Sequence, residues 1–139
     1  MRLGAWLLML GRKLETGGNL MLKDTGITVV QLLMLRYIRL NPEQAQIADI
    51  ARFFGVKHTS TIHVVQSMEK KGYVYREQIP HSCGKNIKLT DLGEKVAAHN
   101  EDVTDQTEEI MLKGFSEEEK TLLFQFLSRI NDNMDEGFQ

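Results

Sequence analysis

The chain has 139 residues, of which 42% are hydrophobic and 26% are charged, so it predicts one folded domain with a core and excludes a disordered chain. Its formal charge is −2, and its single cysteine, Cys83, excludes an internal disulfide and favours a reducing compartment. The apolar run after Arg2 has helical spacing and is too short for a signal peptide or a membrane span. We therefore expect a cytoplasmic protein without a membrane segment.

The first two predicted elements are helices. The apolar residues of residues 2–14 recur at steps of three and four: Leu3, Trp6, Leu7, Leu10 and Leu14. This spacing predicts an amphipathic helix, which we expect the two glycines at 17–18 to end. Thr28 is the predicted N-cap of a second helix, which is apolar on most sides and therefore buried. The pair Asn41-Pro42 is expected to stop it.

The middle of the chain predicts two short helices and a hairpin. Residues 46–54 and 59–71 have helical spacing, with a tight turn at Gly55-Val56 between them and Gly72 after the second. The runs YVYRE and NIKL predict two strands, and QIPHSCGK between them predicts their loop. Two helices around a turn followed by a hairpin form a winged helix-turn-helix. The predicted fold class is therefore mainly α with a small β-hairpin wing.

The last third of the chain predicts two further helices. Thr90 is the expected N-cap of a long helix that reaches about Lys113. Its apolar stripe is expected at Leu92, Val96, His99, Val103, Thr107 and Ile110. Gly114 ends this helix, and Ser116 with Glu119 predicts a capping box at the start of the last one.

The helix over residues 59–71 has one apolar and one polar side. The residues expected to pack inward are Thr61, Val64, Val65 and Met68. The opposite side presents Thr59, Ser60, His63, Gln66, Ser67 and Lys70. An α-helix fits the major groove of B-DNA, where Gln pairs with adenine and Ser or Thr bond with less discrimination. Basic residues at the margins, namely Lys57, Lys70, Lys71 and Arg76, suit phosphate contacts.

The charge of the chain is segregated in the same region. Residues 52–88 hold seven basic side chains against two acidic ones, a net charge of +5, so the remainder carries −7. A local positive field attracts an anionic partner, although the same clustering also occurs by chance on solvated surfaces.

Three motifs resemble the MarR family of transcriptional regulators. They are Ile47-Ala48-x-Ile50-Ala51-x-x-Phe54-Gly55-Val56, then Met68-Glu69-Lys70-Lys71-Gly72-Tyr73-Val74, and then Leu89-Thr90-x-x-Gly93. The resemblance runs from about Thr28 to Gly93. It implies a winged helix on a helical dimerisation region, and a homodimer that binds a near-palindromic operator on double-stranded DNA, usually as a repressor. Release by a small phenolic or lipophilic molecule, or by an oxidant, is also implied.

The resemblance and the residues together give a set of expected sites. Residues 1–27 are the expected N-terminal dimerisation helix, 28–89 the DNA-binding lobe, and 90–139 the C-terminal dimerisation helices. The expected DNA-binding residues are Lys57, His58, Thr59, Ser60, His63, Gln66, Ser67, Lys70, Arg76, Lys85 and Lys88. At the wing, His81 and Cys83 stand where the family usually has an Asp and an Arg, so wing contacts are expected from Lys85, Lys88 or the backbone.

The apolar stripes of the first and last helices predict a dimer, because no fourth helix of the chain closes a bundle over them. The expected dimerisation residues are Leu3, Trp6, Leu7, Leu10, Leu123, Phe126, Leu127 and Ile130. A three-helix packing within one chain is the alternative. Two-fold symmetry would match two half-sites one DNA turn apart.

The sequence also offers alternatives to DNA binding. Cys83, flanked by His81 and Lys85, is a candidate redox switch, with an incidental surface thiol as the alternative. Without the wing Arg, a protein-interaction module without specific DNA binding is the alternative from another class. The spacing of His and Cys matches no standard zinc motif, and no phosphate loop, Gly-x-Ser-x-Gly or His-Glu-x-x-His motif occurs. Neither a metal, a cofactor nor an enzyme activity is therefore predicted.

Overall fold

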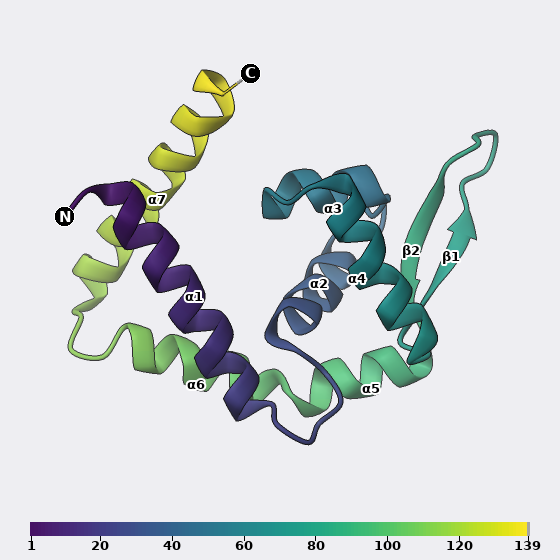
Figure 1. Cartoon of the computed structure of the whole chain (residues 1–139), viewed down its shortest axis with the longest axis horizontal. Helices are drawn as coiled ribbons and strands as arrows, with labels where there is room; N and C mark the ends of the chain where they lie inside the picture. Colours follow the sequence, from purple (N-terminus) through teal and green to yellow (C-terminus); the bar gives the residue numbers. More distant parts are fainter. Residues whose placement is uncertain (139) are drawn as a thin grey trace. The chain divides into compact units, whose positions relative to one another are not determined.

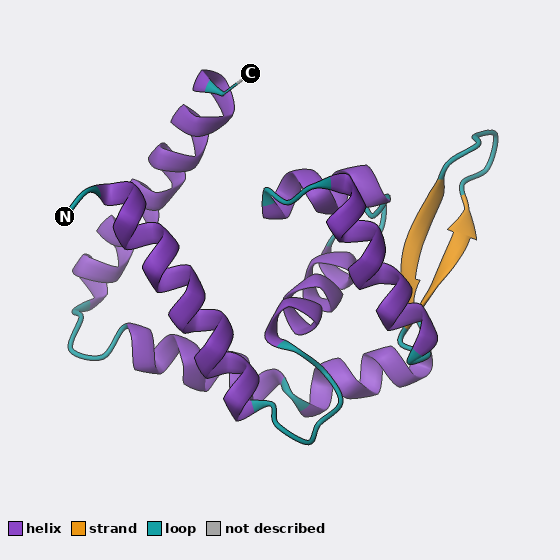
Figure 2. Ribbon diagram, viewed as in Figure 1, coloured by secondary structure: helices purple, strands orange, loops and turns teal. Residues whose placement is uncertain are grey.

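A computed structural model describes residues 1–138 and is mainly α-helical, with a two-stranded antiparallel hairpin (Figures 1 and 2). This confirms the predicted fold class. In chain order the elements are α1 (Leu3–Met21), α2 (Val29–Leu40), α3 (Ile47–Phe54), α4 (His58–Lys70), β1 (Val74–Gln78), β2 (Lys85–Leu89), α5 (Asp91–His99), α6 (Glu101–Met111) and α7 (Glu117–Gly137). None of the helices over this range is long and apolar enough to cross a membrane.

The chain forms two compact units. The first unit, Met1–Thr104, holds α1 to α5, the hairpin and the start of α6; the second, Asp105–Gln139, holds the rest of α6 and α7. The predicted division at residues 27 and 89 separates a DNA-binding region from dimerisation regions, which is a division by role and not into compact units. It stays a prediction.

The core of the first unit is built around α2. This helix contacts α1, α3, α5 and β2, which explains why it is apolar on most sides. Thr28 caps it in a capping box with Gln31, and it ends at Leu40 before Asn41, so both predicted ends are confirmed. The largest fully buried side chains around it are Met34, Leu35, Ile38, Ile50, Met68, Ile87, Val65 and Thr61.

Helix α1 does not end at the two glycines, as the sequence predicted, but continues to Met21. Gly18 is buried against α2, and a Cβ added to it would lie 2.8 Å from Cγ2 and 2.9 Å from Cβ of Val29. Oδ1 of Asn19 accepts a hydrogen bond of 2.8 Å from the Val29 N–H. The glycine is therefore needed for close packing between two helices. Local helix propensity alone would assign it to the end of a helix.

The predicted long helix after Thr90 is also wrong, because it is interrupted at Asn100. This residue is buried, its Nδ2 donates to the Val96 carbonyl at 2.9 Å, and its own carbonyl accepts from the Val103 N–H at 3.2 Å. An Asn side chain that bonds to nearby backbone competes with the helical ladder, which favours the break.

The predicted stripe on α5 and α6 is confirmed in part, because Val96 and Val103 pack partly against the core. Leu92 and Ile110 are exposed, and the fully buried residues are instead Gly93, Ala97 and Asn100. A Cβ on Gly93 would lie only 2.0 Å from the backbone oxygen of Tyr73, so small residues let α5 pack directly on the start of the hairpin. A search for large apolar side chains cannot find such a face.

The two neighbouring glycines of α1 offer a matched test of this packing. We expect Gly18→Ala to lower the free energy of unfolding by about 1–3 kcal/mol, because the added methyl overlaps Val29. Gly17→Ala meets no atom within 4 Å and should instead stabilise by about 0.5–1 kcal/mol. Urea unfolding followed by circular dichroism measures both, and equal effects of the two substitutions would contradict the close contact.

Candidate nucleic-acid interface

The turn between α3 and α4 has the geometry of a helix-turn-helix. Gly55 has a φ of +64°, in the left-handed region that glycine adopts without strain, and the Val56 N–H donates to the Ala51 carbonyl at 3.1 Å. Ala51 is buried on α3, which packs against α4. Figure 1 shows the two helices with the hairpin beside them. The predicted turn is confirmed.

An aromatic cluster supports α3 from the side of α2. The ring centroid of Tyr37 lies 4.5 Å from that of Phe53 and 5.9 Å from that of Phe54. The Tyr37 hydroxyl donates to the Gln44 carbonyl at 2.8 Å. Burial, and then the Asp49 carboxylate, raise the pKa of Tyr37. The hydrogen bond from its hydroxyl fixes the segment before α3.

Helix α4 separates into the two faces that its sequence predicted. Thr61, Val65 and Met68 are fully buried and Val64 packs partly against the core. The Thr61 hydroxyl donates to the carbonyl of Lys57 at 3.1 Å, so its polar group is satisfied within the helix. A Thr at this position is therefore compatible with the expected rotation of α4.

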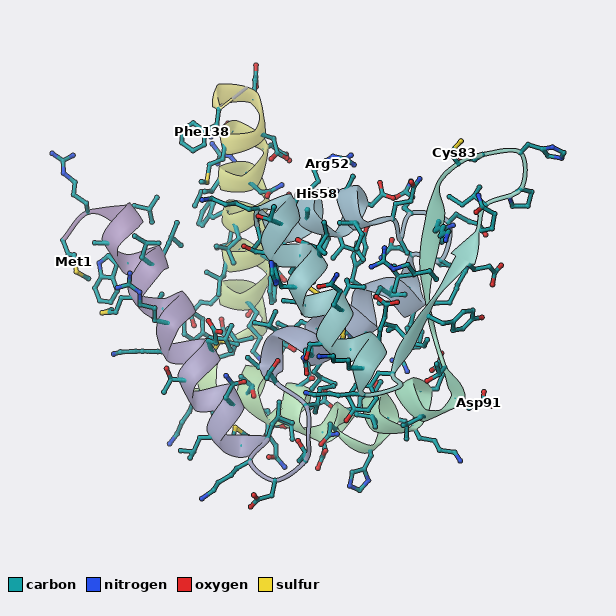
Figure 3. All side chains as sticks on the ribbon, turned by 45° about the vertical axis from the view of Figure 1, so that its right-hand side comes forward. Met1, Arg52, His58, Cys83, Asp91 and Phe138 are labelled. Atoms are coloured by element: carbon teal, nitrogen blue, oxygen red, sulfur yellow. The ribbon has the colours of Figure 1, made fainter. Side chains whose placement is uncertain are left out.

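The predicted reading residues lie on the exposed side of this helix. Those that are exposed are Lys57, His58, Thr59, Ser60, His63, Gln66 and Lys70. Figure 3 shows the side chain of His58 at the beginning of α4. A shallow hollow on the same helix is lined by His63, Gln66, Ser67, Glu69 and Lys70. Ser67 differs from the others, because it is half-buried and its Oγ accepts a hydrogen bond of 3.3 Å from Nε2 of Gln31.

The C-terminal end of α4 is held by backbone and side-chain bonds. The Tyr73 N–H donates to the Met68 carbonyl and the Gly72 N–H to that of Glu69, with Gly72 at a φ of +80°. This is a glycine-based helix end, as predicted. Lys71, which the sequence placed among the phosphate contacts, donates from Nζ to the carbonyl of Gly26 at 2.8 Å.

The hairpin is anchored through the middle of β2 to the segment before α3. Val74 pairs with Leu89 at one end of the ladder and Gln78 with Lys85 at the other. The Ile87 N–H donates to the Ala45 carbonyl at 2.8 Å. The strands therefore start from a fixed position relative to the helix-turn-helix.

The basic residues of the hairpin have different surroundings. Nη2 of Arg76 lies 3.0 Å from Oε1 of Glu69 on α4, and Nζ of Lys88 donates to the Pro42 carbonyl at 3.1 Å. Lys85 is exposed at the end of the ladder next to the loop. Arg76 thus links the wing to α4, while Lys85 is the wing cation that the structure presents most openly.

The loop of the wing carries the remaining predicted residues. Cys83 is a free, exposed thiol near the tip, as Figure 3 shows, and His81 is exposed with a φ of +60°. Gln78 closes the loop by donating from Nε2 to the Gly84 carbonyl at 3.1 Å. Among residues 1–138 no three His, Cys, Asp or Glu side chains are grouped as metal ligands would be.

One residue at this interface was missed by the sequence analysis. Gln31 is buried on α2 and forms hydrogen bonds with Ser67 on α4 and with Lys71 just after it. The spacing Thr28-x-x-Gln31 predicts a capping box and would have identified the helix end, but not the contacts across 36 and 40 residues of sequence.

Comparisons with known proteins agree with this geometry. Residues 25–82 match the model of the MarR family. The chain is 28% identical over 134 residues to the HTH-type transcriptional regulator YybA of Bacillus subtilis, with 94% of this chain and 87% of the relative covered. The chain is therefore similar to MarR-family regulators, with the family match over residues 25–82.

Solved structures of MarR-family proteins have the same fold as this one. MepR of S. aureus, in complex with DNA, matches with a TM-score of 0.84 and 21% identity, covering 96% of each chain. A MarR-family regulator of Listeria monocytogenes, in complex with a 26-mer DNA, matches with a TM-score of 0.89 and 18% identity, covering 99% of this chain and 91% of that one. The family model and the curated relative both describe transcriptional regulators, which agrees with the expectation of a regulator rather than an enzyme.

The rotation of α4 is open to a direct test. Met68→Ala should lower the free energy of unfolding by about 2–5 kcal/mol, because Met68 is fully buried. His63→Ala, five residues earlier on the exposed side, should change it by no more than about 0.5 kcal/mol. Chemical denaturation of both variants provides the comparison, and a large loss of stability for His63→Ala would mean that the helix is rotated.

Proposed function

We propose that this protein is a MarR-family transcriptional regulator that binds double-stranded DNA sequence-specifically as a homodimer on a near-palindromic operator and acts as a repressor. The observation that carries the proposal is the exposed polar face of α4, which lies opposite a fully buried apolar face and begins at a tight helix-turn-helix turn. A surface helix usually exposes charged side chains, whereas this one exposes short hydrogen-bonding groups suited to base edges.

The proposed roles follow from position along α4. Gln66 and His63, in the middle of the exposed face, are assigned to base edges, with Thr59 and Ser60 before them. Lys57 is assigned to phosphate, because it precedes the helix N-terminus, where unpaired backbone N–H groups also favour an anion. Lys70 at the other end is assigned to phosphate as well.

We assign the wing to contacts with the sugar-phosphate backbone of DNA. Lys85 is exposed. Arg76 is paired with Glu69 and Lys88 with the Pro42 carbonyl, so a phosphate would compete with these partners for the two basic groups. A salt bridge with both side chains about one-third exposed, as between Arg76 and Glu69, contributes little stability and exchanges readily. The DNA complexes solved for MepR and for the Listeria regulator support a DNA partner for this chain.

The homodimer rests on apolar side chains that α1 and α7 each leave exposed. On α1 these include Leu3, Trp6 and Leu10, and on α7 Phe126 and Leu127. Such rows are typical of an interface with a second copy, and two-fold symmetry would place two reading helices on two half-sites. Leu7, Leu123 and Ile130 are partly buried beside them.

Release of the operator by a small ligand rests on the resemblance to the family alone, and no described residue is assigned to it. Location in the cytoplasm rests on the sequence, whose single cysteine favours a reducing compartment. The redox alternative rests on Cys83, a free and exposed thiol, and stays a prediction of the sequence.

The operator is tested by selection from a random-sequence duplex library at near-physiological salt. We expect enrichment of an inverted repeat whose half-sites lie about one DNA turn apart. On that sequence Gln66→Ala should relax base preference at one position per half-site, at a cost of about 1–3 kcal/mol. Lys70→Ala should weaken binding to all sequences alike and lower the salt slope by about 1.

The same measurements separate the proposal from a protein-interaction module. A module of that kind would enrich no sequence, and its weak DNA binding would respond to neither substitution. That outcome would overturn the assignment of the α4 face to bases.

The homodimer is tested by mass. We expect light scattering at micromolar concentration to give about twice the mass of one chain, and the double variant Trp6→Asp with Phe126→Asp to lower it, because each Asp would lie unpaired in the apolar interface. Leu40→Asp, at an exposed apolar residue of α2, is the matched control and should leave the mass unchanged. A wild-type protein with the mass of one chain would refute this part.

A further inference from the structure

We infer that Gln31 and Lys71 are positioning residues that set the angle of the DNA-reading helix α4, an inference that rests on the proposed function. Gln31 lies on α2 and is only 6% exposed, so it is withdrawn from the surface that would meet DNA. Buried polar side chains have to be hydrogen-bonded, and this one is bonded to three different parts of the first unit.

Gln31 uses both ends of its amide. Its Oε1 accepts from the Thr28 N–H at 3.3 Å, which closes the capping box of α2, and from Nζ of Lys71 at 3.0 Å. Its Nε2 donates to Oγ of Ser67 at 3.3 Å. The N-terminus of α2 is thereby tied to the last turn of α4 and to the residue that follows it.

Lys71 reinforces this connection from the other side. Its Nζ also donates to the Gly26 carbonyl at 2.8 Å, and it lies 5.9 Å from the centroid of the Tyr73 ring. The hydroxyl of Tyr73 donates to the same carbonyl at 3.3 Å. Lys71 is an exposed residue, but its ammonium group contacts two neutral acceptors and an aromatic face, which hold it in place rather than neutralise its charge.

The consequence for binding is geometric. Base-reading contacts need side chains held to within about 0.5 Å and 10–20° of the productive arrangement. Gln66 and Lys70 lie next to Ser67 and Lys71 in the sequence, so a tilt of the last turn of α4 displaces the reading face directly. Both lysines are exposed, but Nζ of Lys71 is bonded to Gly26 and Gln31. Lys71 therefore affects DNA affinity through this geometry, whereas Lys70 affects it through charge.

The test compares Lys71→Met, Gln31→Met, the double variant and Lys70→Met on the selected operator, over a range of salt concentrations. We expect Lys71→Met and Gln31→Met each to raise Kd about tenfold, which is about 1.4 kcal/mol. The double variant should also show a loss of about tenfold rather than a hundredfold, since residues in one network are not additive. Lys71→Met should leave the salt slope unchanged, and Lys70→Met should lower it by about 0.9.

Two further measurements keep the outcome clear. Urea unfolding at the binding temperature establishes that each variant is folded. If Gln31→Met is not folded, Gln31→Glu replaces it in the binding measurements. A carboxylate at this position still accepts from Lys71 and from the Thr28 N–H, so Gln31→Glu should bind within about threefold of wild type, and Lys71→Met in that background should lose about tenfold.

The results separate this inference from the proposed function. A wild-type protein that selects no operator overturns the proposed function, and the positioning role with it. If the wild type selects an operator and Lys71→Met lowers the salt slope as much as Lys70→Met does, then Lys71 contacts phosphate. In that case only the positioning inference is refuted. A double variant with a hundredfold loss would have the same meaning, because the two side chains would then act independently.

Discussion

The burial of one side of α4 is the constraint on which the rest of the interface depends. Thr61, Val65 and Met68 are fully removed from water, so only one rotation of the helix satisfies the core. Apolar burial is roughly proportional to area, and turning the helix would expose these side chains and bury His63 and Gln66 without partners. The core therefore decides which side chains α4 presents, and it does so without any contact from the presented side chains themselves.

Polar contacts then refine what apolar packing sets only coarsely. Packing fixes the rotation of α4, but its tilt is tied on one side by Gln31 and Lys71 and on the other by the Arg76–Glu69 pair. The hairpin is tied independently to the segment before α3 through Ala45. Several basic residues of the positive segment consequently have partners within the protein, and a count of charges overstates how many are free to meet an anion.

The sequence predicted most of the fold because its signals there are local. A capping Thr, a glycine in the left-handed region and a 3.6-residue apolar period act within one or two turns of a helix, and Thr28, Gly55 and Ser116 all behave as predicted. The wrong predictions at Gly18 and at Asn100 concern residues whose roles depend on a neighbour. Gly18 looks like a helix end until Val29 is placed against it, and Asn100 looks like an ordinary helical position until it is buried.

By itself, the sequence determined the winged helix, the apolar and polar sides of α4 and the resemblance to the MarR family. The tertiary structure alone decided which polar groups are free. Ser67 and Lys71 belong to the same pattern as Gln66 and Lys70, yet Gln31 engages the first two from a helix more than thirty residues earlier. Hydrogen bonds at such separations are formed by packing and leave no periodicity in the chain, which is why only the folded structure distinguishes reading residues from those that hold them in place.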